Sequence, residues 1–163
     1  MKISKKMQNA INEQINKELY SEYLYINMAC YFFDNNLSGF GNFFLKQAEE
    51  EREHAMKFFK YVYERRGSVK LKEIKKPDIS FNSILSVFEK ALEHEEYVTK
   101  SIYELVNIAR EEKDEASLEF LNWFVKEQVE EEANMDQIVN MLKMGKDNPN
   151  FIMLLDSKLG ERK

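Results

Sequence analysis

The sequence predicts an all-α protein, a four-helix bundle with one long crossover connection and a short fifth helix. Three observations predict this class. Helix breakers are rare, with only 5 glycines and 2 prolines among 163 residues. The long stretches between them are rich in Glu, Lys, Leu, Ala and aromatic residues, a composition typical of helices. Within those stretches apolar residues recur at alternating three- and four-residue spacing, as they do on the inner faces of a bundle.

The breakers delimit four long helices. They are expected at about residues 4–34, 40–66, 81–112 and 115–144. A short fifth helix is expected over about 149–159, because Asn148 can cap it and Pro149 suits the first helical position. We expect a single domain over residues 1–163, with the bundle itself in about 4–144.

The connection between the second and third helices is longer than the other two. Residues 68–80 contain Pro77, which disfavours helix there. Fully extended, this segment reaches roughly 40 Å, about the length of the second helix. We therefore expect the connection to run the length of the bundle, so that the second and third helices are parallel. One long crossover among short turns is the topology of ferritin-like bundles.

Composition excludes several other classes of protein. The net charge is −5, and Lys2, Lys5 and Lys6 are scattered lysines rather than a nucleic-acid-binding tail. Cys30 is the only cysteine, which rules out an internal disulfide and a CxxC metal site. The chain begins with polar residues and has no apolar run long enough to cross a membrane. We expect a cytoplasmic protein that binds neither nucleic acid nor membrane.

A glutamate interrupts the apolar inner face of each long helix near its middle. The four are Glu18, Glu51, Glu95 and Glu131. Their distances from the two short turns match, so folding brings them to one level. Buried anions repel one another and lose several kcal/mol of hydration each. No inner face offers a lysine or arginine at this level, and shared protons could rescue two carboxylates but hardly four. We therefore predict metal cations.

His54 strengthens this prediction, because it follows Glu51 by three residues and so lies on the same helix face. Oxygen ligands with one nitrogen and no sulfur suit iron or manganese, and zinc could also occupy such a site. Tyr25 lies two turns after Glu18 on the same face. It is either a packed aromatic side chain or a hydrogen-bonding or electron-supplying neighbour of the metals.

Four segments carry a resemblance to a known family. They are Glu-Leu-Tyr at 18–20, Glu-Glu-Arg-Glu-His at 50–54, His-Glu at 94–95 and Glu-Gln-Val-Glu-Glu at 127–131. With these segments the chain resembles the bacterial and archaeal non-haem ferritins over essentially its whole length. The resemblance implies a ferroxidase centre with two irons per chain, at which dioxygen or peroxide oxidises Fe(II). It also implies ferric mineral stored inside a shell of twenty-four identical subunits.

The resemblance also implies which residues form the centre, with Glu51 bridging the two irons. The ligands implied for the first iron are Glu18, Glu51 and His54. Those implied for the second iron are Glu51, Glu95 and Glu131, with Gln128 beside it. A third iron position would fall on Glu50, Glu127 and Glu130. The alternative for these last three is an ordinary exposed acidic helix face.

Departures from neighbouring families narrow the expectation. Bacterioferritins and rubrerythrins resemble this pattern but carry a second Glu-x-x-His on the fourth helix, where this chain has Gln128-x-x-Glu131. Arg52 occupies the position of the haem-binding methionine of bacterioferritins, so no haem is expected. The only other histidine, His94, is expected to turn away from the inner face and not to bind metal.

Three functions remain open from the sequence. The first is iron storage with ferroxidase activity, and the second is a di-iron oxidoreductase or peroxidase without storage. The third is a helical interaction protein that binds no metal. Apolar side chains outside the inner faces favour assembly with other copies of the chain. On the first helix they are Tyr20, Tyr23, Tyr31 and Phe33, and on the fifth, expected to be exposed, they are Phe151, Ile152, Leu155 and Leu159.

Overall fold

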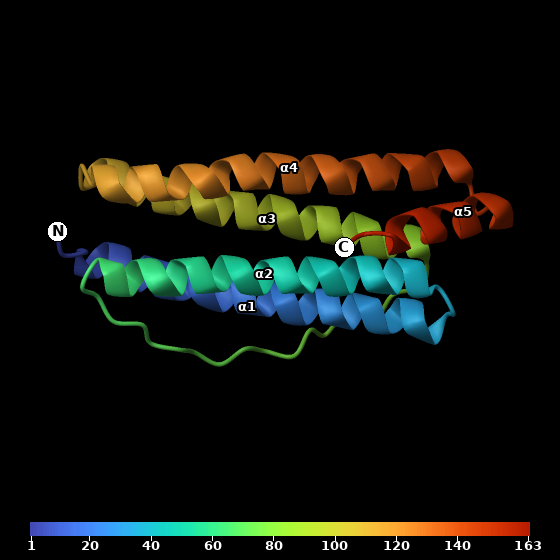
Figure 1. Ribbon diagram of the computed structural model, residues 1–163, viewed down its shortest axis with the longest axis horizontal. Helices are drawn as coiled ribbons and strands as arrows, with labels where there is room; N and C mark the ends of the chain where they lie inside the picture. Colours follow the sequence, from blue (N-terminus) through green and yellow to red (C-terminus); the bar gives the residue numbers. More distant parts are fainter.

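The computed structural model describes residues 1–163 and contains five helices (Figure 1). They are α1 (Lys5–Asp34), α2 (Ser38–Glu64), α3 (Ile84–Glu111), α4 (Glu115–Gly145) and α5 (Pro149–Gly160). The first four lie side by side along the long axis, and α5 packs mainly against α2 at one end of the bundle. This confirms the predicted fold class. None of the helices combines the length and hydropathy that a bilayer-spanning segment needs.

Two helix ends differ by a few residues from the predicted boundaries. α3 begins at Ile84 rather than 81, because Ser83 and Ser86 form a reciprocal capping box there. α2 ends at Glu64 rather than 66, where the backbone of Arg66 adopts a left-handed φ of 57°.

The start of α2 also differs from the prediction, because Gly39, which was expected to precede the helix, lies inside its first turn. The helix begins at Ser38 rather than 40. A Cβ on Gly39 would overlap the backbone carbonyl of Asp156 in α5. The absence of a side chain at Gly39 therefore allows the two helices to approach closely, and the residue does not interrupt α2.

The long crossover runs along the bundle as expected, and α2 and α3 point in the same direction (Figure 1). Three asparagines on α1 donate hydrogen bonds from their side-chain amides to the backbone of the crossover. Asn16 donates to the carbonyl of Glu73 at 2.9 Å, and Asn12 donates to that of Ser68 at 3.3 Å. Asn27 does the same further along, at Ile79. The extended segment thus has partners for part of its backbone although it belongs to no helix.

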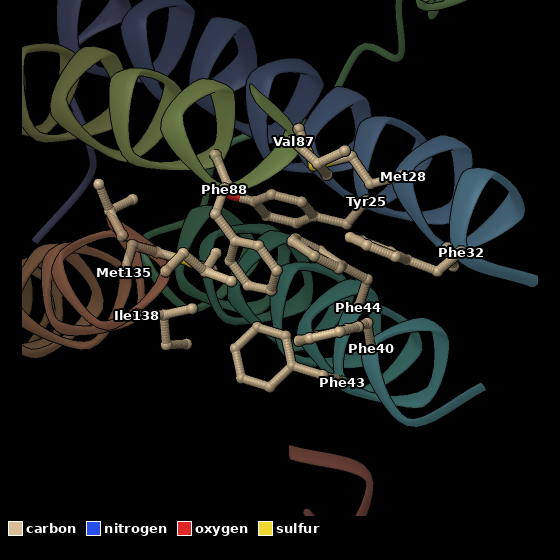
Figure 2. Packing of buried hydrophobic residues seen from close by; sticks show 14 of the residues in the cluster. Tyr25, Met28, Phe32, Phe40, Phe43, Phe44, Val87, Phe88, Met135 and Ile138 are labelled. Carbon is tan, nitrogen blue, oxygen red and sulfur yellow. The ribbon is translucent and has the colours of Figure 1, made fainter. Parts of the chain in front are cut away.

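The hydrophobic core consists of two clusters with a polar layer between them. One cluster is rich in phenylalanine and includes Phe32, Phe40, Phe44 and Phe88. Figure 2 shows side chains of this cluster pointing toward one another from α1, α2, α3 and α4. The other cluster fills the end of the bundle near the chain start. Along every long helix, the residues between the two clusters include one buried glutamate.

The exposure predicted for α5 is wrong. Leu155 is only 3% exposed and belongs to the phenylalanine-rich cluster. Phe151, Ile152 and Leu159 are partly buried against the same cluster. The apolar side chains that α5 leaves exposed are Met153 and Leu154, at 68% and 71%. The helix therefore uses the predicted apolar stripe to dock onto its own bundle.

Phe88 lies at the centre of the phenylalanine-rich cluster, and its removal is expected to destabilise the protein strongly. Its ring is fully buried, with centroids 5.0 Å from Phe44 and 5.7 Å from Phe40. We expect Phe88→Ala to lower the free energy of unfolding of the metal-free protein by about 3–5 kcal/mol, because it leaves a cavity. Urea denaturation measures this change. Tyr103→Ala, at an exposed position of the same helix, should cost far less.

Candidate metal centre

The polar layer gathers the four predicted glutamates from four helices. Glu18, Glu51 and Glu95 are each 1% exposed, and Glu131 is 4% exposed. Each occupies an inner-face position because the heptad-like spacing of its helix is continuous through it. The structure therefore buries all four carboxylates at one level, as the spacing predicts.

His54 faces two of these carboxylates with one ring nitrogen. Its Nδ1 lies 3.5 Å from Glu51 Oε2 and 3.8 Å from Glu18 Oε2. The three ligand atoms lie close enough together to hold one metal ion. This group is the set of residues predicted for the first iron.

The second ring nitrogen of His54 faces the opposite way. Its Nε2 lies 3.9 Å from Glu127 Oε1, and His54, Glu127 and Glu131 form a second group with metal-binding spacing. The set predicted for the second iron is arranged differently. Glu95 lies in the same layer, but its two oxygens accept hydrogen bonds from Tyr25 and Gln128. In this structure Glu131 therefore lies near His54, whereas Glu95 is hydrogen-bonded to Tyr25 and Gln128.

Three buried glutamines support the carboxylates. Gln14 donates to Glu18 at 2.8 Å. Gln47 donates to Glu131 at 2.7 Å, and Gln128 to Glu95 at 3.1 Å. An amide N–H stabilises a carboxylate without adding charge. The glutamines therefore orient the carboxylates, and the negative charge of each carboxylate stays available to a cation.

Sequence reasoning predicted Gln128 but assigned no role to the other two glutamines. A local signal was present in the sequence. Gln14 and Gln47 each precede a buried glutamate by four residues, which places the amide and the carboxylate on one helix face.

The three residues predicted for a third iron do not form one group. Glu127 faces His54, as described above. Glu50 instead lies 2.6 Å from the guanidinium of Arg162, and Glu130 is exposed at the edge of a pocket. The ligand role of this set stays a prediction.

Burial raises the pKa of every carboxyl group in the layer. Desolvation is the main cause of the raised pKa of Glu18 and of Glu51, and repulsion from neighbouring carboxylates adds to it. The same two causes raise the pKa of Glu131 to about 8. Desolvation also raises the pKa of Glu95. Without a cation, the layer therefore retains protons near neutral pH, and a cation would displace them.

One oxygen in the layer has no hydrogen-bond partner. Glu18 Oε2 is buried without a donor, on the side that faces His54. A buried unsatisfied carboxylate oxygen costs on the order of 1–3 kcal/mol, so such atoms are rare in folded proteins. A divalent cation between Glu18, Glu51 and His54 would satisfy this atom, and the oxygen and nitrogen donors present suit iron, manganese or zinc.

The other histidine, His94, faces away from the layer. It forms a 2.7 Å hydrogen bond with Ser21, and burial lowers its pKa to about 4. It belongs to neither group of closely spaced ligand atoms.

Tyr25 is fully buried and donates a hydrogen bond to Glu95. Tyr25→Phe would leave that carboxyl oxygen without its donor. We expect the free energy of unfolding of the metal-free protein to fall by about 1–3 kcal/mol. Chemical denaturation at pH 7 measures the change, with Tyr103→Phe at an exposed position as the matched control. Equal effects of the two substitutions would mean that the hydrogen bond contributes nothing.

Fold and site together define a helical bundle protein with a buried carboxylate and histidine centre suited to transition-metal ions. A family model described as a ferritin-like domain matches residues 8–144. The chain therefore belongs to the ferritin family.

Relatives match along nearly the whole chain. A bacterial non-heme ferritin of Staphylococcus aureus (strain MRSA252) is 40% identical over 160 residues, covering 98% of this chain and 96% of the relative. One from Campylobacter jejuni is 42% identical over 154 residues, covering 94% and 92%. A crystal structure of an open pore ferritin from the archaeon Archaeoglobus fulgidus superposes with a TM-score of 0.97. Its chain is 47% identical, and the match covers 99% of this chain and 98% of that one.

Proposed function

We propose that this protein stores iron in the cytoplasm and acts as a ferroxidase, with Fe(II) and dioxygen or peroxide as its substrates. The observation that carries the proposal is the buried layer of four carboxylates, with His54 as a shared member of two groups of closely spaced ligand atoms. Membership of the ferritin family and the non-heme ferritin relatives support it.

In the proposed reaction two Fe(II) ions enter the layer and displace the protons held there. Each Fe(II) gives up one electron. Where dioxygen is the oxidant, one dioxygen molecule takes up these two electrons and two protons and becomes hydrogen peroxide. We assign the first ion to Glu18, Glu51 and His54, and the second to Glu51, Glu95 and Glu131, with Gln128 as a hydrogen-bond donor beside it. Tyr25 keeps Glu95 oriented between turnovers.

The oxidised iron then leaves toward the acidic side of α2 and α4. We propose that Glu127 receives it, because this carboxylate faces the outer nitrogen of His54 and is partly accessible. Glu50 and Glu130 complete the proposed third position. Ferric mineral would then accumulate inside a closed homo-oligomeric shell, which we expect to contain twenty-four subunits.

The test is size-exclusion chromatography of metal-free protein after aerobic loading with Fe(II), recording protein and iron absorbance together. Iron that elutes with one very large discrete particle, far beyond two ions per chain, would support oxidation with storage. A small oligomer that retains only about two irons per chain would contradict storage and favour a di-iron oxidoreductase. Protein that retains no iron would contradict both.

A further inference from the structure

Arg162, just beyond the end of α5, reaches back across α2. Its Nη2 lies 2.6 Å from Glu50 Oε2, and its Nη1 donates to Gln47 Oε1 at 2.9 Å. The guanidinium also lies 4.8 Å from the ring centroid of Phe43. These three contacts hold a side chain that is only 25% exposed. Arg162 is therefore fixed in one orientation by partners that all belong to α2.

Gln47 connects this arginine to the metal centre. The amide is 1% exposed, and its Nε2 donates to Glu131 Oε2 at 2.7 Å. A glutamine amide has one accepting end and one donating end, whereas a guanidinium can only donate. Arg162 therefore fixes the oxygen of Gln47 outward, which leaves the N–H groups facing the carboxylate. A rotated amide would present its oxygen to Glu131 and repel it.

The contact lies in the wall of an open pocket of about 620 Å³ between α2, α4 and α5. Gln47, Glu50 and Arg162 line this pocket, and Lys158 contributes a second cation. Glu131 itself lies behind Gln47 and is nearly inaccessible. The orientation of Glu131 thus depends on residues at the pocket wall.

We propose that Arg162 is a positioning residue for the metal centre, acting through Gln47 on Glu131. This inference rests on the proposed function, since it requires that the layer bind metal ions. It adds that the segment just after α5 contributes to the centre although Arg162 does not reach the ions. Because α5 docks against α2, metal affinity at Glu131 depends on that docking.

An arginine suits this role for two reasons. Its guanidinium stays protonated at all accessible pH values, and its fixed fork can engage Glu50 and Gln47 at the same time. A lysine ammonium carries the same charge but does not reproduce the two-pronged geometry. We therefore expect Arg162→Lys to retain only part of the metal affinity that Arg162 provides at Glu131.

The experiment is calorimetric titration of metal-free protein with Zn²⁺, which binds without redox chemistry. The binding step that involves Glu131 is identified as the one lost in Glu131→Gln. We expect Arg162→Ala to weaken this step by about 3–10-fold, since an outer hydrogen-bond partner of a metal ligand typically contributes 10–100-fold and Arg162 acts through one. The step assigned to Glu18, Glu51 and His54 should keep its affinity.

A double-mutant cycle tests whether the effect passes through Gln47. In a Gln47→Leu background, Arg162→Ala should weaken the Glu131 step no further. Lys158→Ala also removes one positive charge from this pocket, but Lys158 has no hydrogen bond to Gln47, so this variant should bind Zn²⁺ like the wild type. Circular dichroism and the unfolding temperature establish that each variant is folded.

Three outcomes would overturn the proposal while leaving the proposed function intact. The first is an Arg162→Ala protein that binds Zn²⁺ like the wild type. The second is an equal loss of affinity in Lys158→Ala, which would mean that only the charge matters. The third is a loss in Arg162→Ala that adds fully to that of Gln47→Leu, which would mean that the effect does not pass through Gln47. Wild-type protein that binds no Zn²⁺ would instead contradict the metal centre itself, and the inference with it.

Discussion

Glu51→Gln is expected to slow the initial oxidation of Fe(II) by on the order of 100-fold or more, because it removes the carboxylate proposed to bridge the two ions. The same substitution should stabilise the metal-free protein. Glu51 is buried among other carboxyl groups, and the neutral amide of glutamine has nearly the same shape. Removing a buried acid whose pKa is raised by desolvation should increase the free energy of unfolding by about 1–3 kcal/mol at pH 8.

The opposite signs of these two effects make the experiment specific to a binding site. Stopped-flow absorbance of ferric products measures the rate, and urea denaturation of metal-free protein measures stability. Glu53→Gln is the matched control, since it removes one carboxylate from an exposed position of the same helix. It should change neither quantity appreciably. Slow oxidation with reduced stability would point to misfolding, and an unchanged rate would remove Glu51 from the proposed centre.

The metal-free protein is expected to lose stability as the pH rises from 5 to 9. Burial raises the pKa of Glu131 from an ordinary 4.5 to about 8, and that of Glu18, Glu51 and Glu95 moves in the same direction. A carboxyl group with a raised folded-state pKa binds its proton more tightly when folded. Its stabilising contribution is complete below pH 4.5 and is lost as the pH rises through about 8.

The size of this effect follows from the same shift. Each pKa unit corresponds to about 1.4 kcal/mol, so Glu131 alone accounts for at most about 5 kcal/mol between the two limits. Urea denaturation at several pH values measures the loss, and saturating Zn²⁺ should reverse most of it. Glu131→Gln should flatten the curve near pH 8, whereas Glu96→Gln at an exposed position should not. Stability that is constant or rises over this range would contradict the prediction.

Local patterns predicted the fold and the glutamate layer well, because both depend on helix periodicity. The spacing around Glu18 and Glu131 places each on an inner face without knowledge of any partner. The length of the crossover relative to α2 was enough to predict parallel helices. The family itself is confirmed by the comparisons, whereas the ligand roles stay predictions.

Contacts between elements far apart in sequence could not be predicted in this way. Arg162 and Gln47 are separated by 115 positions, and their contact exists only because α5 folds back onto α2. The same docking buries Leu155, which was expected to be exposed on the fifth helix. It also explains why a glycine occupies position 39, since the backbone of α5 approaches α2 too closely there for a side chain. Periodicity identifies which face of a helix is apolar, but not which neighbour covers it.

The polar layer also determines how the helices align along their axes. The two apolar clusters on either side of it would tolerate many arrangements of similar side chains. A slide of one helix by one turn, about 5.4 Å, would move its glutamate from the layer into one of those clusters. Hydrogen bonds between helices, such as those from Gln47 to Glu131 and from Gln128 to Glu95, would break as well. The carboxylates thereby select one register from several that would bury comparable apolar surface, and that register is the one in which four helices present their ligands at a single height.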